Sequence, residues 1–265
     1  MSETKYFPTV EAIDKAAQVL DEILEPTPFQ RNANLSDIYE AEIYLKREDL
    51  QMVRSYKIRG AYNKIRTIDP ELVTNGIVCA SAGNHAQGVA FSCSKLKIMG
   101  SIFMPVTTPR QKIEQVRMFG KEFIEIILTG DTFDAANSAA IAYAKENNKT
   151  FIPPFDDPKV MEGQGTIGRE ILNQSKEPLD YIFVPIGGGG LASGLGAYIS
   201  QMSPDTKIIG VEPGGAPCMK AAIENGGPVK LEHIDKFVDG AAVQLAGTHT
   251  YEVCRQVLDD IIVVP

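Results

Sequence analysis

Short apolar runs recur along the chain, and a longer stretch with helical periodicity follows most of them. Runs of about four to eight apolar residues bounded by Gly, Pro or Asp are typical of strands that are buried on both faces. Between two of these runs, residues 132–147 place Phe133, Ala136, Ala140 and Ala144 on one helical face. The alternation predicts an α/β protein built on parallel sheets. The predicted strands are residues 43–45, 77–80, 101–104, 123–127, 181–185 and 208–212.

One segment interrupts this pattern more strongly than any other. Residues 152–158 read Ile-Pro-Pro-Phe-Asp-Asp-Pro, and neither a helix nor a strand interior accommodates so many prolines. We therefore expect the chain to cross between domains there. The prediction is a large domain made of residues 1–73 plus 151–265, and a small domain made of residues 74–150.

The last residues of the chain, 260–265, read Asp-Ile-Ile-Val-Val-Pro and predict a buried strand. No helical stretch follows this strand, although the sheets of α/β proteins are normally covered on both faces. We therefore expect that the C-terminal part of the large domain is missing beyond Pro265.

Composition narrows the function. The net charge of −8 argues against nucleic acid as a partner, because phosphate backbones are bound by a surplus of Lys and Arg. Residues 1–14 lack the basic start and apolar run of a secretory signal, and no apolar stretch approaches the roughly 20 residues that cross a bilayer. The expected location is the cytoplasm, with no membrane partner. The four cysteines are widely spaced and predict neither disulfides nor a zinc site.

A lysine stands at the start of a predicted helix. Apolar residues at positions 58, 61, 62, 65 and 68 predict a helix from about residue 56, with Ser55 as its N-cap. Lys57 would then lie in the first turn, where the helix dipole and the nearby Arg54 and Arg59 would lower its pKa. A neutral amine is what the capture of an aldehyde requires. Taken alone, the segment is more typical of a solvated lysine on a helix surface.

A strand-to-helix turn follows the predicted strand 77–80. It reads Ser81-Ala82-Gly83-Asn84-His85, and the free N–H groups at the start of the next helix could bind a carboxylate. The alternative is an ordinary tight turn in which Asn84 tolerates a strained backbone.

A run of four glycines follows the predicted strand 181–185. Gly187, Gly188, Gly189 and Gly190 lead through Leu191 into a helix of small residues, and so many glycines let several backbone N–H groups converge on a phosphate. The run also fits the dinucleotide fingerprint, with Glu212 at the end of the next strand, so a nicotinamide-dependent oxidoreductase is an alternative. A P-loop is excluded, because no Lys-Ser or Lys-Thr pair follows the glycines.

Together, three segments resemble the signatures of the threonine and serine dehydratases of pyridoxal-phosphate fold type II. They are Ser55-Tyr56-Lys57-Ile58-Arg59-Gly60, Ser81-Ala82-Gly83-Asn84-His85 and Gly187-Gly188-Gly189-Gly190-Leu191. The resemblance extends to residues 46–51 and 163–167, and covers nearly the whole chain. It implies two domains, each with a mostly parallel twisted sheet flanked by helices, and pyridoxal 5'-phosphate as cofactor.

The resemblance also implies roles for individual residues. Lys57 would carry the cofactor covalently and Tyr56 would lie beside its ring. Asn84 would hydrogen-bond the ring hydroxyl and, with Ser81, Gly83 and His85, line the pocket for the substrate carboxylate. The phosphate would be bound by the amides of Gly187, Gly188, Gly189, Gly190 and Leu191.

The implied reaction is the deamination of L-threonine to 2-oxobutanoate and ammonia, or of L-serine to pyruvate, with Lys57 as the base that removes the Cα proton. A racemase of this family would commonly carry a second serine where this chain has Ala82, so elimination is favoured. Residues 214–218 include no acidic side chain, and we expect no essential metal. The resemblance further implies a homodimer or homotetramer and a role in isoleucine biosynthesis.

Two features of the family are lacking before Pro265. One is a Ser-Gly-Gly-Asn-like segment whose hydroxyl contacts the pyridine nitrogen, and the other is the regulatory amino-acid-binding domain of biosynthetic members. A further alternative is therefore a non-catalytic amino-acid-binding protein on the same scaffold.

Overall fold

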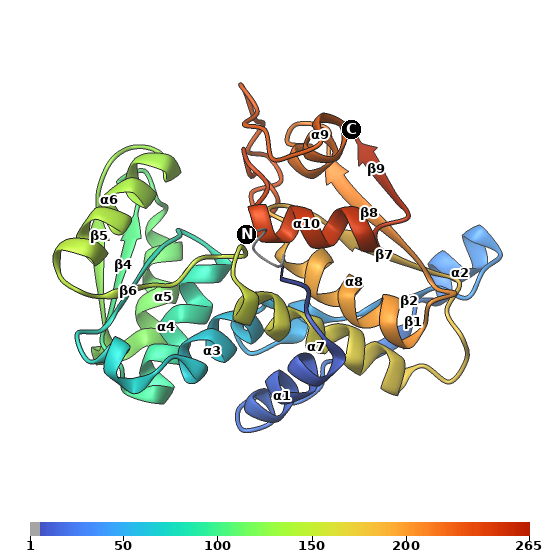
Figure 1. The fold of residues 1–265 in the computed structure, drawn as a ribbon, viewed down its shortest axis with the longest axis horizontal. Helices are drawn as coiled ribbons and strands as arrows, with labels where there is room; N and C mark the ends of the chain where they lie inside the picture. The colour runs from blue at the N-terminus through green and yellow to red at the C-terminus, as the bar shows by residue number, and fades with distance from the viewer. Residues whose placement is uncertain (1–5) are drawn as a thin grey trace, which may run out of the picture.

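Two parallel sheets and a short antiparallel pair form the framework of the computed structural model, which describes residues 6–265 (Figure 1). The α/β prediction is confirmed. The predictions for the start of the chain, namely no secretory signal in residues 1–14 and a large domain beginning at residue 1, fall partly on residues outside this range. None of the helices within residues 6–265 is both long enough and apolar enough to span a bilayer.

The first sheet has four parallel strands in the order β5-β4-β3-β6. Alternate residues of β3, one of the two central strands, face opposite layers of helices. Ile77 and Cys79 pack in the cluster that includes α4 and α5, whereas Val78 and Ala80 pack against α6. This period of two is what burial on both faces requires. The elements are β3 (Ile77–Ala80), α4 (Asn84–Leu96), β4 (Gly100–Met104), α5 (Arg110–Gly120), β5 (Ile124–Leu128), α6 (Phe133–Glu146) and β6 (Thr150–Phe151).

The second sheet has three parallel strands in the order β7-β8-β9. One face packs against α8, α9 and α10 through a cluster that includes Ile182 and Val184. The elements are β7 (Tyr181–Pro185), α8 (Gly190–Met202), β8 (Lys207–Pro213), α9 (Cys218–Asn225), α10 (Thr248–Val257) and β9 (Asp260–Val264).

The opposite face of this second sheet corrects one prediction. Residues 260–265 were expected to form a buried strand, but Ile262 of β9 is 43% exposed, and on β7 the stacked rings of Tyr181 and Phe183 are 59% and 62% exposed. No helix within residues 6–265 covers this face, so its side chains are only partly buried in this structure.

Three further helices pack on one another: α1 (Val10–Leu20), α3 (Lys57–Thr67) and α7 (Pro158–Gln174). Helix α7 also packs on α8 (Figure 1). Small residues let α7 approach α3 closely, because a Cβ on Gly163 would lie 2.6 Å from the Arg59 carbonyl oxygen. The remaining elements are β1 (Phe29–Arg31), α2 (Ala33–Tyr39), β2 (Tyr44–Lys46), and the short 3-10 turns Glu48–Leu50, Pro70–Val73 and Lys121–Phe123.

A buried group of charges ties α3 to its neighbours. Arg59 is 1% exposed, and its guanidinium donates to both carboxylate oxygens of Glu48 (2.8 and 2.9 Å) and of Glu170 on α7 (2.6 and 3.0 Å). Lys46 of β2 donates to Glu170 as well, at 2.5 Å. Each charge of this buried group therefore has a partner of opposite sign. Such pairing is the condition for charges to be tolerated in a protein interior.

The beginning of α3 corrects a second prediction. The helix begins at Lys57 with Tyr56 at the N-cap position, and no side chain caps it. The hydroxyl of Ser55, predicted as the N-cap, is buried and has no hydrogen-bond partner among the described residues. Arg54 adopts φ +58°, so the chain turns immediately before Ser55 and the first helical residue lies one position later than the apolar pattern indicated.

Removing the buried guanidinium should destabilise the fold strongly. We expect Arg59→Ala to lower the free energy of unfolding by about 3–5 kcal/mol, because Glu48 and Glu170 would remain buried without their partner. Urea denaturation measures the change. The matched control is Arg31→Ala, which removes an exposed Arg–Glu pair with Glu42 and should change stability little. Equal losses in the two variants would contradict the role assigned to burial.

Candidate active site

Lys57 is the first residue of α3, and its side chain points toward the segment that connects the first sheet to α7. Its Nζ donates to the Pro154 carbonyl oxygen at 3.0 Å and lies 5.5 Å from the centre of the Tyr56 ring. Burial lowers the pKa of Lys57 to about 8, because the protein interior disfavours the ammonium ion. Near neutral pH a useful fraction of this amine is therefore uncharged.

The predicted direction of this pKa shift is confirmed, but the two arginines predicted to contribute are not its cause. Arg59 does not act on the amine as a free charge, because its guanidinium is neutralised by Glu48 and Glu170. Arg54 is exposed to solvent. Desolvation alone accounts for the shift of Lys57.

The connecting segment, residues 152–157, brings the three predicted motifs together. The carbonyl of Ile152 accepts a hydrogen bond from His85 Nε2 (3.0 Å), and the carbonyl of Pro154 accepts from Lys57. The ring of Phe155 packs directly on the glycine run, since a Cβ built on Gly188 would lie 2.4 Å from it. The lysine, the turn before α4 and the glycine run thus all contact the four consecutive residues 152–155.

The turn that contains Ser81 and Gly83 leads into α4 beside the start of α3. Gly88, in the second turn of α4, approaches the backbone of Lys57 and Ile58, where a Cβ would lie 3.1–3.2 Å away. Ser81 Oγ accepts from the Gly83 amide (3.2 Å), and the space around Gly83 is open. Asn84, the first residue of α4, is exposed.

The ring of His85 is buried rather than open to a pocket. Burial lowers the pKa of His85 to about 3, and the positive charge of Lys57 adds to the shift. The ring is therefore neutral at pH 7, and its Nε2–H must be the donor, because the Ile152 carbonyl can only accept. The backbone N–H of His85, at the start of α4, is the group it can still offer to a ligand.

The glycine run forms the turn from β7 into α8, as predicted. Gly189 has φ +93° and caps the helix, a conformation that side chains rarely adopt. The first intrahelical bond of α8 is donated by Ser193 to Gly189, so the N–H groups of Gly190 and Leu191 have no carbonyl one turn behind them. This loop can therefore receive an anion at a helix N-terminus.

Glu212, the acidic residue of the dinucleotide alternative, is already engaged. Its buried carboxylate accepts from the amides of Met219 (2.8 Å) and Lys220 (2.9 Å) and so caps the start of α9. It is therefore not free to bind a ribose. Within residues 6–265, no group of three or more His, Cys, Asp or Glu side chains could hold a metal ion; the four cysteines are free and buried.

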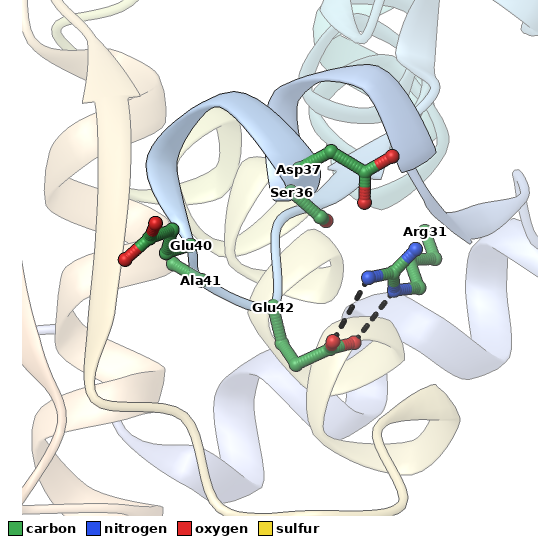
Figure 2. Close-up of a pocket in the computed structure, with 6 residues that line it drawn as sticks. All are labelled: Arg31, Ser36, Asp37, Glu40, Ala41 and Glu42. Carbon is green, nitrogen blue, oxygen red and sulfur yellow. Dashed lines mark hydrogen bonds and ion pairs between the residues drawn. The ribbon is translucent and has the colours of Figure 1, made fainter.

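A surface hollow of about 440 Å³ lies elsewhere, between β1 and α2 (Figure 2). Figure 2 shows the Arg31–Glu42 ion pair across it, and both side chains are largely exposed. None of the residues that line it belongs to the three predicted motifs, and it is not the candidate site.

The sequence did not identify residues 152–157 as part of the site. They were interpreted only as a domain crossing, yet their carbonyls and the Phe155 ring contact all three motifs. The available signal was Asp156-Asp157, two acids after two prolines. Asp157 caps α7 through the amides of Lys159 and Val160, and Asp156 accepts from three amides that begin α10.

Comparisons with known proteins give a consistent result. The family described as pyridoxal-phosphate dependent enzyme matches residues 20–265. The chain is 55% identical over 97% of its length to the biosynthetic L-threonine dehydratase of Halalkalibacterium halodurans, and equally to that of Bacillus subtilis. It spans only 62% and 61% of these two relatives.

Solved structures agree with these relatives. The processed form of threonine deaminase isoform 2 from Solanum lycopersicum superposes with a TM-score of 0.90 at 39% identity, covering 100% of this chain and 77% of that one. Maize serine racemase superposes with a TM-score of 0.92 at 30% identity, covering 98% and 77%.

The lowered pKa of Lys57 predicts a reactivity profile. The neutral amine accumulates as the pH rises through about 8, so labelling of Lys57 by trinitrobenzenesulfonate should accelerate through that pH and then level off. Peptide mapping by mass spectrometry resolves the rate at each lysine. Lys145, exposed on α6, provides the comparison within the same sample. A Lys57 rate with no plateau above pH 8 would contradict the shift.

The contact between Phe155 and the glycine run predicts an asymmetry between two glycines. Gly188→Ala should lower the free energy of unfolding by about 1–3 kcal/mol, because the added Cβ overlaps the ring. Gly83→Ala is the control, since nothing lies within 4 Å of its added Cβ, and it should shift stability by less than about 0.5 kcal/mol. Chemical denaturation of both variants tests this, and a neutral Gly188→Ala would refute the packing.

Proposed function

The chain belongs to the family of pyridoxal-phosphate-dependent enzymes, and from that premise we propose that it deaminates L-threonine to 2-oxobutanoate and ammonia. The observation that carries the proposal is the position of Lys57, whose amine bonds the Pro154 carbonyl while the next residue, Phe155, packs on the glycine run. An amine of lowered pKa thus bonds a segment whose next residue packs on the turn proposed to bind the phosphate. The names of the two relatives reported above, biosynthetic L-threonine dehydratases, support threonine as the substrate.

The residues present fit pyridoxal phosphate. Attachment of its aldehyde needs an amine that is partly neutral near pH 7, which Lys57 supplies with a pKa of about 8. Its phosphate needs several converging N–H groups, which the loop of Gly187, Gly188, Gly189, Gly190 and Leu191 offers at the start of α8. Tyr56, the N-cap residue directly before Lys57, would lie beside the ring.

When bound, this cofactor supplies an aldehyde carbon that bonds amines and a ring that accepts negative charge from the substrate Cα. With the cofactor and substrate bound, the amine of Lys57 would remove the Cα proton as a general base. Loss of that proton and of the Cβ hydroxyl releases water. Hydrolysis of the resulting enamine consumes one water and yields 2-oxobutanoate and ammonia.

The turn at the start of α4 would bind the substrate. Ser81 and Asn84 can offer side-chain donors, and Gly83 leaves open space for a carboxylate. The contribution of His85 would come from its backbone N–H, because its ring is buried and bonded to Ile152. Asn84 would also reach the cofactor ring hydroxyl. Ala82 stands where a racemase of this family commonly has a serine that transfers the second proton, which supports elimination. L-serine would be a second substrate.

The two parallel sheets support the division into a small domain of residues 74–150 and a large domain of residues 1–73 plus 151–265, because each sheet lies within one of them. A cytoplasmic location, a homodimer or homotetramer, and a role in isoleucine biosynthesis follow from the family resemblance. The proposal includes no metal, no nucleic acid and no membrane as partners.

The proposal is tested by incubating the chain with pyridoxal phosphate and L-threonine and measuring 2-oxobutanoate. We expect an absorbance band near the edge of the visible range and formation of the keto acid. Borohydride reduction should attach the cofactor permanently to Lys57. Lys57→Ala should abolish the band and lower the rate by about 10²–10⁴-fold, the usual contribution of a general base.

The control is Lys145→Ala, which removes an exposed lysine on α6 and should leave both readings unchanged. Binding of threonine without a Lys57-dependent band would instead favour a non-catalytic amino-acid-binding protein. Binding of a nicotinamide cofactor would favour an oxidoreductase, and either result would reject the proposal.

A further inference from the structure

The carbonyl groups of the glycine run are held from behind by side chains outside it. Thr250 Oγ1 on α10 donates to the Gly188 carbonyl at 2.7 Å, and Ser193 Oγ donates to that of Gly190 at 3.2 Å. The thiols of Cys218 and Cys254 donate to the carbonyls of Gly187 (3.3 Å) and Gly189 (3.8 Å). Burial raises the pKa of Cys218 to about 12, so this thiol keeps its proton and remains a donor.

The planarity of the peptide bond turns this arrangement into an orientation of donors. In a trans peptide the C=O of one residue and the N–H of the next point in opposite directions. A carbonyl of Gly188 fixed toward Thr250 therefore directs the N–H of Gly189 to the other side of the loop. The same reasoning applies to the other three carbonyls, so the N–H groups of Gly188, Gly189, Gly190 and Leu191 face away from the anchoring side chains.

Among these anchors, Thr250 makes the shortest bond. Its side chain is fully buried, and its amide donates to Asp156 Oδ1 at 3.0 Å. Asp156 also accepts from the amides of Thr248 (2.9 Å) and His249 (2.8 Å), which places a carboxylate at the positive end of α10. Asp156 directly follows Phe155, so α10 is tied to the segment that Lys57 contacts.

Gly189 adds a steric reason why Thr250 must lie where it does. A Cβ on Gly189 would lie 2.9 Å from both Cβ and Oγ1 of Thr250, so the loop backbone rests directly against this side chain. The hydroxyl therefore fixes the loop both by contact and by a directed hydrogen bond. A methyl group in its place would keep the contact and lose the bond.

We propose that Thr250 is a positioning residue for phosphate recognition, which orients the loop amides by holding the Gly188 carbonyl. The inference rests on the proposed function, since it presumes that the loop binds the phosphate of pyridoxal phosphate. Thr250 does not touch the ligand. Its effect is confined to the phosphate, whereas the aldehyde is bound by Lys57.

The experiment compares pyridoxal phosphate with pyridoxal, which has the same aldehyde and no phosphate. The affinity of each for the 265-residue chain is measured from the absorbance of the lysine-bound form. The variants are Thr250→Val, which keeps the shape, and Thr250→Ser, which keeps the hydroxyl. Thr248→Val is the matched control, since it removes an exposed hydroxyl from the same helix.

We expect Thr250→Val to weaken pyridoxal phosphate about tenfold, which corresponds to one hydrogen bond of about 1.4 kcal/mol, and to leave pyridoxal within about twofold. Thr250→Ser should restore most of the loss, and Thr248→Val should change neither affinity. Inorganic phosphate should also compete less well with pyridoxal phosphate in Thr250→Val. Thermal unfolding of every variant checks that the fold is retained.

The outcomes separate the two proposals. If the wild-type chain forms no Lys57-dependent complex with either aldehyde, the proposed function fails and Thr250 has no such role. If the wild-type chain prefers pyridoxal phosphate and Thr250→Val keeps that preference, the inference about Thr250 is overturned while the proposed function stands. Equal weakening of both aldehydes, or no rescue by Thr250→Ser, would likewise overturn it by showing a general structural defect.

Discussion

The candidate site depends on one stretch of backbone, the crossing segment of residues 152–157. Its carbonyls at Ile152 and Pro154 accept hydrogen bonds from His85 and Lys57, and its Asp156 carboxylate binds the start of α10. Proline has a restricted φ and no N–H. Pro153 and Pro154 therefore restrict the backbone conformations of this segment and help to fix the directions of these carbonyls. Groups far apart in the sequence thus meet because they share partners on a stiff segment.

The environment of Lys57 depends on how the neighbouring Arg59 of α3 is paired. Arg59, two residues further along, is fully neutralised by Glu48 and Glu170, and anchors the helix without acting as a free cation beside the amine. Burial then lowers the pKa of Lys57 to about 8. The buried charge group and the proposed reactive amine are thus separate groups on one helix, since Arg59 fixes α3 and Lys57 is the residue proposed to react.

Local sequence patterns predicted the elements well and the contacts between them poorly. Strand positions within a residue or two, the helix after residue 132 and the glycine turn followed from periodicity and glycine content, which are properties of short segments. The N-cap of α3, the buried ring of His85 and the role of residues 152–157 depend on what packs against them from distant parts of the chain. The exposure of Ile262 on β9 likewise depends on whether another element covers that face.

A glycine turn from a strand into a helix serves dinucleotides and other phosphates alike, because both use the free N–H groups of the helix. What separates the alternatives here is the use made of the surrounding polar groups. The acidic residue near the end of the next strand, Glu212, caps α9 instead of remaining available for a ribose. Thr250 and the two thiols donate to carbonyls of the turn, and the ring of Phe155 packs on the same turn. The residue before Phe155, Pro154, accepts a hydrogen bond from the amine of Lys57. A phosphate-bearing aldehyde would use both the N–H groups of the turn and the amine of Lys57, whereas a dinucleotide would leave the amine unused.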